Sequence, residues 1–478
     1  MKLIPTIVTV TLVLCFPITA AAQGDRQQMI RVEAPAIALN NVRIIDGTGA
    51  APLEGQTIVI RGGKIELIGP TAATTVPVDT RTVDLAGYTV LPGLVGMHNH
   101  LFFPMGGSPP IYSNMGISFP RLYLALGVTT IRTTGSVAPF TDLEIKKRID
   151  AGQMIGPKMH VTAPYLEGKG SFTPVMHELT GPDDARKLVN YWADQGATSL
   201  KAYMNITRDE LRAAVEEARK RKMKVTGHLC SVTYREAAEI GIDDLEHGLF
   251  ASTDFVANKQ PDRCPGGANQ AMANLDIASA PVQDLIKTLV SRNVAITSTL
   301  PVFEASAPVV QNGIGAARAV LNPRMLNTMS NDARIRYLNS RARIPGNSNT
   351  AALIRKAMDF ELAFYRAGGL LIAGLDPTGN GGTVAGFGDL REVQLLVEAG
   401  FTPLEAIKIA TFNGAKFLGE DARIGSVAVG KQADLMIVKG NPAANIFDLE
   451  NVEIVFKDGV GYDTEKLIQS VQGLVGVR

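Results

Sequence analysis

The chain contains only six histidines, and two of them, His98 and His100, stand two positions apart. They follow VLPGLVGM, an apolar run typical of a buried β-strand. Residues two apart on a strand point to the same side, so both imidazoles can reach one ion. Alone, such a pair is weak evidence, because two surface histidines would look the same.

Nitrogen and oxygen donors end four further apolar runs. Lys201 lies in ATSLKAYM, His228 in KVTGHL and His247 in IDDLEHG, while Asp376 ends LLIAGLD. One polar residue at the end of one strand is unremarkable, but donors at the ends of five strands indicate a shared site. Imidazole and carboxylate are good zinc ligands, and a catalytic zinc keeps a position for water.

Lys201 is the unusual member of this set, because an ammonium has no lone pair and repels cations. A lysine at a metal centre must lose its proton, and burial favours that loss. Reaction with carbon dioxide would then give a carbamate, N6-carboxylysine, whose two oxygens can bridge two metal ions. The alternative is a buried lysine paired with a carboxylate. The presence of four histidines and Asp376 as further candidate ligands favours the carbamate.

The elements that must position these donors alternate between strands and helices. Several strands precede amphipathic stretches, such as RDELRAAVEEARKRK at 208–222. Eight strand–helix units predict an α/β fold, a (β/α)8 TIM-like barrel over 88–420, in which the carboxyl ends of the strands face the active site. The eight candidate strands end at VLPGLVGMHNH, VTTIRTTG, PKMHVTAPY, ATSLKAYM, KVTGHL, IDDLEHG, VAITSTL and LLIAGLD.

The segments flanking the barrel have a different texture. Short Val- and Ile-rich runs separated by Gly and Asp-Gly turns occupy 37–87 and return at 421–465. This pattern predicts β-hairpins that join into one small β-sandwich formed by the N- and C-terminal segments. Near the barrel's end, Thr402, Pro403 and Glu405 predict the start of a helix that stops at Gly419.

The barrel segment exceeds the usual ~250 residues, so insertions are expected at 251–290 and 304–360. The second insertion is basic, with eight Lys or Arg and one Asp between Arg318 and Lys356. Its arginines could belong to a lid that holds a substrate carboxylate. The alternatives are a solvated helical surface or a subunit contact.

Residues 1–22 have the pattern of a secretory signal peptide. Lys2 precedes the apolar run LIPTIVTVTLVLCFPI, and small residues lead to a cleavage site after Ala22. A membrane anchor is the alternative, but the run is short and two prolines interrupt it. A lipidated Cys15 is weakly supported, because large apolar residues flank it. We therefore expect a secreted or periplasmic protein with no membrane attachment after cleavage.

The mature chain would keep two cysteines, Cys230 and Cys264. An oxidising compartment permits a disulfide between them, and two unpaired thiols are the alternative. The formal net charge of +1 gives no field that would attract nucleic acid. The oligomeric state stays open, and a homo-oligomer is compatible with the sequence.

The six donors and the split β segments together resemble the binuclear amidohydrolase superfamily, over about 37 to 465. The T-G-H and L-E-H-G segments are similar to the imidazolonepropionase-like and Xaa-Pro dipeptidase-like branches. The resemblance implies two divalent ions, with zinc favoured by ligand type. It also implies the ligand sets: His98, His100 and Asp376 on the more buried ion, His228 and His247 on the more exposed one, and carbamylated Lys201 as the bridge.

The function implied is hydrolysis of an amide C–N bond in a small-molecule substrate such as a dipeptide or an N-acyl amino acid. A hydroxide bridging the two ions would attack the carbonyl, with Asp376 as proton shuttle and catalytic residue. The alternatives are a cyclic amide or lactone hydrolase, a deaminase, or a barrel that has lost its chemistry. Lys201 argues against a deaminase, and the complete donor set argues against lost chemistry.

Substrate contacts are predicted at two further positions. Tyr203, two after Lys201, shares its inward face and could hydrogen-bond the substrate or simply pack. His177 lies in the loop EGKGSFTPVMHEL, where a substrate contact and a solvated side chain are both open. His160, earlier on its strand, is expected to be structural.

Overall fold

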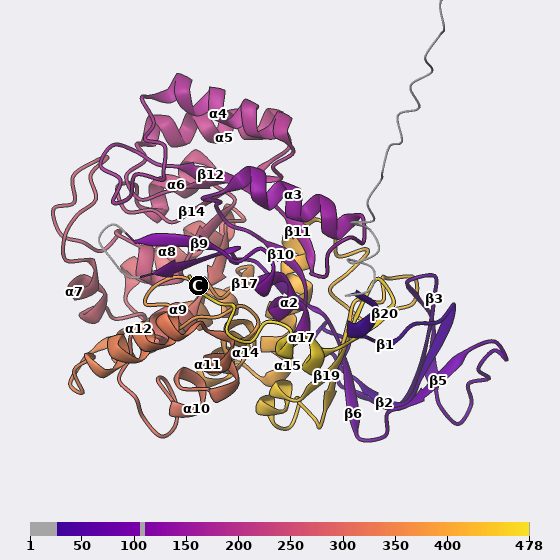
Figure 1. The fold of residues 1–478 in the computed structure, drawn as a ribbon. Helices are drawn as coiled ribbons and strands as arrows, with labels where there is room; N and C mark the ends of the chain where they lie inside the picture. The colour runs from indigo at the N-terminus through magenta and orange to yellow at the C-terminus, as the bar shows by residue number, and fades with distance from the viewer. Residues whose placement is uncertain (1–25, 106–109, 478) are drawn as a thin grey trace, which may run out of the picture.

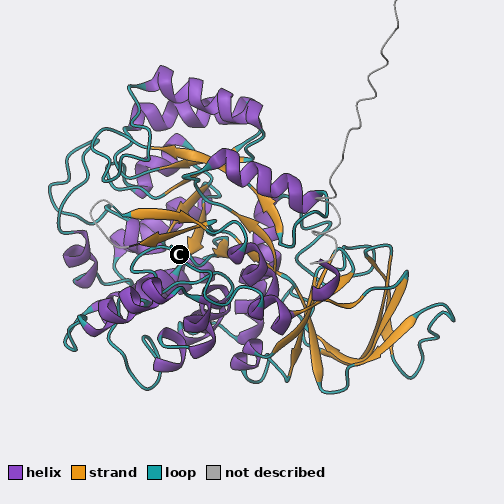
Figure 2. Cartoon of the chain, viewed as in Figure 1, coloured by secondary structure: helices purple, strands orange, loops and turns teal. Residues whose placement is uncertain are grey.

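The fold is known from a computed structural model that describes residues 26–105 and 110–477. The predicted signal peptide at 1–22 lies outside the described residues. Figure 2 shows the strands in two groups, one surrounded by helices and one set apart at the side of the molecule. None of the helices in the described ranges is long and apolar enough to cross a membrane.

The helix-surrounded strands form the predicted barrel, in which every neighbouring pair is parallel. The ring closes where Met97 N donates to Ala373 O at 2.8 Å. The third predicted strand is broken at Val161, where pairing passes from one neighbouring strand to the next. The strands are β7 (Leu94–Gly96), β10 (Val128–Arg132), β11 (Lys158–His160), β12 (Thr162–Leu166), β13 (Ser199–Ala202), β14 (Lys224–Gly227), β15 (Asp244–Glu246), β16 (Ala295–Ser298) and β17 (Leu371–Ala373).

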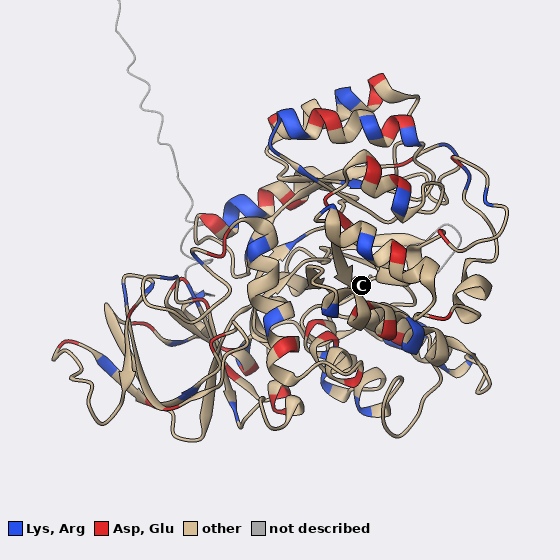
Figure 3. Ribbon diagram, turned by 180° about the vertical axis from the view of Figure 1, so that it is seen from behind, with Lys and Arg blue, Asp and Glu red and all other residues tan. Residues whose placement is uncertain are grey.

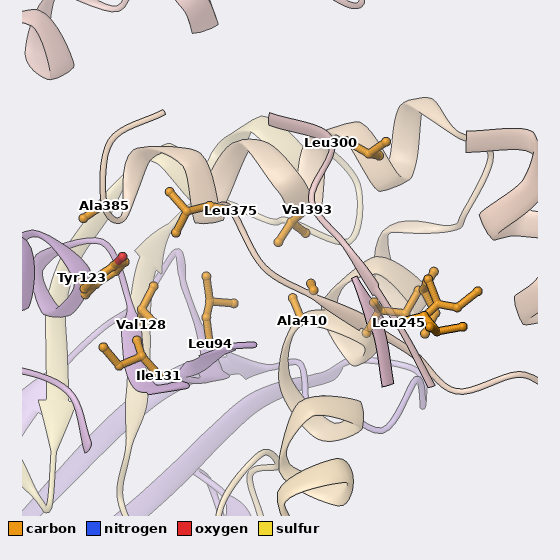
Figure 4. Packing of buried hydrophobic residues seen from close by; sticks show 14 of the residues in the cluster. Leu94, Tyr123, Val128, Ile131, Leu245, Leu300, Leu375, Ala385, Val393 and Ala410 are labelled. Atoms are coloured by element: carbon orange, nitrogen blue, oxygen red, sulfur yellow. The ribbon is translucent and has the colours of Figure 1, made fainter. Parts of the chain in front are cut away.

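One main helix follows each barrel strand except β11, which continues directly into β12 (Figure 1). In α5, a capping box between Thr207 and Glu210 starts the helix, and Leu211, Ala214 and Val215 are buried at helical spacing. Figure 4 shows Val128 and Leu94 of the barrel in one cluster with Val393 of α14. The helices are α2 (Ser118–Ala125), α3 (Pro139–Asp150), α4 (Pro182–Gln195), α5 (Arg208–Lys220), α6 (Tyr234–Ile240), α8 (Ala280–Ser291), α13 (Thr350–Arg366) and α14 (Phe387–Glu398).

The second group of strands comes from both ends of the chain, as predicted. Hydrogen bonds link them in the order β1-β20-β19-β18-β6-β2-β3-β4, with β5 on β2, around a hydrophobic core of their own. N- and C-terminal segments meet where β6 pairs with β18 in antiparallel register. The strands are β1 (Ile30–Val32), β2 (Ala36–Ile44), β3 (Leu53–Arg61), β4 (Lys64–Pro70), β5 (Arg81–Asp84), β6 (Tyr88–Pro92), β18 (Leu435–Lys439), β19 (Val452–Lys457) and β20 (Val460–Asp463).

The remaining elements decorate the barrel. The hairpin β8 (Phe102–Met105) and β9 (Ile111–Asn114) follows the first barrel strand and has no counterpart among the expected elements. The short elements η1 (Gly248–Ala251) and α9 (Leu300–Glu304) lead into the two insertions. The first insertion holds α7 (Ala268–Ala273), and the second holds α10 (Ala317–Val320), α11 (Pro323–Thr328) and α12 (Asn331–Ala342). The short elements η3 (Ile446–Glu450) and α17 (Thr464–Gln469) lie near the C-terminus.

Two local expectations can be compared with the structure. The capping box at Thr402 is present, but the helix it starts is interrupted: α15 (Pro403–Lys408) passes through the π-turn η2 (Ile409–Asn413) into α16 (Gly414–Leu418). Cys230 and Cys264 form a disulfide that ties the first insertion to the end of β14. Basic and acidic residues are interspersed over the helices (Figure 3).

Candidate metal centre

The six predicted donors converge at the carboxyl end of the barrel. They come from, or directly follow, β7, β13, β14, β15 and β17. Asp376 lies at the centre, with Oδ1 3.5 Å from His100 Nε2 and 3.8 Å from His98 Nε2, and Oδ2 3.8 Å from His247 Nε2. The His228 and His247 rings are 4.4 Å apart between centroids.

Three of these residues already meet the geometry of a metal site. Ligand atoms of His98, His100 and Asp376 all lie within 4.8 Å of one another, and all three residues are buried. A buried cluster of two imidazoles and one carboxylate suits a divalent cation.

Hydrogen bonds orient the imidazoles for coordination. His100 Nδ1 lies 3.0 Å from the carbonyl oxygen of Gly135, which can only accept, so Nδ1 carries the proton and Nε2 keeps its lone pair. His98 Nδ1 lies 2.7 Å from Glu246 Oε2 and His247 Nδ1 2.7 Å from Thr299 Oγ1. Histidine ligands commonly have such a partner on the second nitrogen, which fixes the ring and the tautomer.

Glu246 and Arg132 form a support that the sequence analysis missed. Arg132 Nη2 donates to Glu246 Oε1 at 2.9 Å and to Asp244 Oδ2 at 2.7 Å, and its Nε donates to Met97 O at 2.7 Å. One buried guanidinium therefore holds both the carboxylate behind His98 and the backbone just before it. Glu246 and Arg132 lie on two different predicted strands. They meet only because the barrel closes.

Lys201 has the environment that its proposed modification requires. It is 1% exposed, and its Nζ has no hydrogen-bond partner. The nearest carboxylate oxygen, Glu246 Oε1, is 3.8 Å away. Burial lowers the pKa of Lys201 to about 8. The amine therefore has one long ion-pair contact and no hydrogen bond, and a buried amine that loses its proton readily fits a carbamate-forming lysine.

Burial and neighbouring charges also set the state of the other donors. Burial, followed by Lys201, lowers the pKa of His228 to about 4 and that of His98 well below its ordinary value. Burial would raise the pKa of Asp376, but His98 and His100 outweigh it and lower that pKa. The lowered pKa values of His98 and His228 favour neutral imidazoles, and the lowered pKa of Asp376 favours an ionised carboxyl, as coordination requires.

The backbone is unusual at two of the donors. His247 and Asp376 have φ of 68° and 51°, a left-handed conformation that non-glycine residues seldom adopt. Just before Asp376, Gly374 lets β17 approach β7, since a Cβ there would lie 2.4 Å from the Cβ of His98. Backbone geometry therefore turns the carboxylate toward the histidines.

The donors line a cavity of about 270 Å³. Tyr203 lines it beside His228, with 5.0 Å between the ring centroids. His177 is not among the lining residues: it is half exposed and pairs with Asp184 at 2.9 Å, while its neighbour Met176 lines the cavity. His160 lies 3.1 Å from Glu420, away from the cavity. The other lining residues are Phe102, Pro104, Pro110, Tyr112, Val137, Tyr165, Phe172, Thr378 and Gly379.

The basic insertion contributes no arginine to this cavity among the described lining residues. Arg318 pairs with Glu450 at 3.2 Å, and Arg324 with Glu465 at 3.1 Å. The buried Arg341 donates to Ala305 O at 2.6 Å. Most of the insertion's basic side chains thus bind oxygen atoms of the chain itself.

The structure combines a (β/α)8 barrel, a metal site at the carboxyl ends of its strands, and a β-sandwich built from both chain ends. This combination is typical of one class of hydrolase. The model of the amidohydrolase family matches residues 89–460, so the chain belongs to that family. It is therefore a hydrolase of the amidohydrolase family.

Whole-chain similarity appears among solved structures. A Bifidobacterium longum protein described as a prolidase has 25% identity and a TM-score of 0.66, covering 92% of this chain and 99% of that one. A Xaa-Pro dipeptidase with bound methionine has 21% identity and a TM-score of 0.65, covering 90% and 100%. Molinate hydrolase has 19% identity and a TM-score of 0.68, covering 94% and 98%. The last two show the shared fold.

Sequence similarity to characterised proteins is local. A dihydroorotase from Syntrophus aciditrophicus (strain SB) is 46% identical over 69 residues, which are 14% of this chain and 16% of that protein. A 5'-deoxyadenosine deaminase from Methanobrevibacter smithii is 41% identical over 59 residues, 12% and 14% of the two chains. These matches span a small part of either relative.

Proposed function

We propose that the protein is a binuclear metal-dependent hydrolase that cleaves the amide bond of a small substrate, such as a dipeptide or an N-acyl amino acid. The observation that carries this proposal is the buried amine of Lys201, which has no hydrogen-bond partner, among five conventional donors. A carbamylated lysine in that position would serve as a ligand shared by two ions. A site for one ion does not need such a ligand.

The donor set divides into two ligand groups. His98, His100 and Asp376 would hold one ion, and His228 and His247 the other, with carbamylated Lys201 between them. Zinc is favoured by the nitrogen and oxygen ligands. Such ions, when bound, lower the pKa of water and polarise a carbonyl.

The chain's own residues supply the rest of the chemistry. Asp376 Oδ1 accepts no hydrogen bond from the described residues, so it could take the proton of the attacking water and pass it to the leaving amine. Glu246 and Arg132 hold His98 in place, which keeps the donors ordered before substrate arrives. Tyr203 lies where its hydroxyl can donate to the substrate.

The cavity also limits the substrate. A cavity of about 270 Å³ suits a small molecule rather than an exposed loop of a folded protein. The predicted signal peptide supports a location outside the cytoplasm. The Cys230–Cys264 disulfide would be stable there.

The direct test is turnover of metal-loaded protein on dipeptides, N-acyl amino acids, cyclic amides and lactones. We expect cleavage of linear amides, and a loss of about 10²- to 10⁴-fold in kcat for Asp376→Asn with unchanged thermal stability. Turnover of lactones or cyclic amides alone would favour the alternative hydrolase. Undiminished turnover in Asp376→Asn would reject the proton-shuttle role.

A further inference from the structure

The walls of the metal cavity are aromatic and nearly without charge. Besides the six donors, its described lining includes five aromatic rings, Met176 and Val137. Lys201 is the one cationic side chain of the described lining other than histidine, and it is committed to the metal centre. The rings are those of Phe102, Tyr112, Tyr165, Phe172 and Tyr203.

The rings form two walls from different parts of the barrel. Phe102 and Tyr112, on the β8–β9 hairpin, meet edge-to-face with centroids 5.2 Å apart. Tyr203 packs against Tyr165 at 4.8 Å and against Phe172 at 6.3 Å. Such rings present flat apolar surface and the edge-to-face geometry in which a further aromatic group packs well.

The hydroxyls of the three cavity tyrosines have no hydrogen-bond partner among the described residues. Tyr112, Tyr165 and Tyr203 form no hydrogen bond within the described chain. Buried tyrosines elsewhere behave differently. Tyr123 donates to His100 O at 3.0 Å, Tyr337 to Val320 O at 2.7 Å and Tyr234 to Gly248 O at 2.6 Å. Since buried phenols normally find a partner, hydroxyls left free on a cavity wall are available to a ligand.

From this arrangement, and resting on the proposed function, we infer the substrate class. The preferred substrate is an amide with a flat aromatic group beside the scissile bond, whose remaining polar end is held by neutral tyrosine hydroxyls. A neutral hydroxyl can donate to a carbonyl oxygen or to a carboxylate, so this enzyme does not require a charged end on its substrate. A site that used a guanidinium would instead select the carboxylate.

An alternative source of positive charge is a neighbouring chamber. That chamber, of about 210 Å³, shares Pro104, Pro110 and Gly379 with the metal cavity and is lined by Arg336. Arg336 Nε already pairs with Asp332 at 2.7 Å. The test therefore includes this arginine.

The experiment uses four substrates: N-acetylphenylalanine, N-acetylleucine and the carboxamide of each, with acetate release reporting cleavage. For wild type we expect kcat/KM about 10-fold higher for phenylalanine than for leucine, as several aromatic contacts imply. The acid and its carboxamide should agree within about threefold. Phe172→Leu should reduce the phenylalanine preference, whereas Phe140→Leu, an exposed aromatic outside the cavity, should not.

Tyr112→Phe should raise KM for acids and carboxamides alike, while Arg336→Gln should leave their ratio unchanged. Equal or better turnover of leucine substrates would overturn the aromatic preference. An acid preference above about 10-fold that disappears in Arg336→Gln would overturn the neutral recognition and place the charge in the neighbouring chamber.

A binding measurement separates this inference from the proposed function. If metal-loaded wild type releases no acetate from any of the four, linear amide hydrolysis fails. Calorimetry on the Asp376→Asn protein then tests the cavity alone. Tighter binding of N-acetylphenylalaninamide than of N-acetylleucinamide supports the aromatic site, and the reverse order rejects it.

Discussion

Replacing Glu246 with glutamine tests how the protein holds its metal ligands. Both carboxylate oxygens accept hydrogen bonds: Oε2 from His98 Nδ1 at 2.7 Å, and Oε1 from Arg132 Nη2 at 2.9 Å and from Thr226. Glutamine keeps one acceptor oxygen and turns the other into an NH2 group. That group must face a donor, either the Nδ1–H of His98 or the guanidinium of Arg132.

The size of the effect follows from the burial of these partners. Glu246 is 0% and Arg132 1% exposed, so water cannot replace the lost contact. A hydrogen bond involving a charged group contributes about 1.5–3 kcal/mol, and loss of a carboxylate behind a ligating histidine typically costs 10- to 100-fold in metal affinity. We therefore expect metal affinity to fall about 10- to 100-fold in Glu246→Gln.

The assay is metal competition against a chelator, with thermal unfolding measured in parallel. Glu304→Gln is the matched control. Glu304 is 2% exposed and accepts two hydrogen bonds from Arg391, each at 2.7–2.8 Å, but contacts no metal ligand. Both variants should lose stability, and only Glu246→Gln should lose metal affinity. Unchanged affinity in Glu246→Gln, or equal losses in the two variants, would refute the positioning role.

Two further predictions concern stability. The Cys230–Cys264 bond closes a separation of 34 residues, so Cys264→Ser should lower the free energy of unfolding by about 3–4 kcal/mol, as measured by denaturant titration, and a loss below about 1 kcal/mol would contradict a formed bond. Hydrogen bonding to Arg366 lowers the pKa of Glu405 from 4.5 to about 2, so this group's stabilisation is complete above pH 4.5 and is lost as the pH falls toward 2. The stability difference between wild type and Glu405→Gln should therefore shrink over that interval, and a difference that stays constant across it would disprove the linkage.

Much of the fold could be predicted because its signals are local. Each barrel strand is a short apolar run, and α5 shows its capping box and apolar spacing within 15 residues. The donors stand at the ends of those runs, so the rule that strand carboxyl ends meet was sufficient to collect them.

What escaped prediction depends on contacts between distant segments. Arg132 and Glu246 are 114 residues apart, and nothing near either marks them as partners. The left-handed backbone at His247 and Asp376 and the hairpin β8–β9 follow from packing rather than from local preference. Tyr112 and Phe172 reach the cavity from loops and a hairpin whose course the sequence pattern does not fix.

The central claim is that Lys201 joins two ions at one site, and metal content per chain tests it most directly. Protein loaded with zinc in bicarbonate buffer and then desalted should retain about two ions per chain by elemental analysis, and Lys201→Ala should retain one or none. At most one ion per chain in the wild type, with the same content in Lys201→Ala, would contradict the binuclear centre.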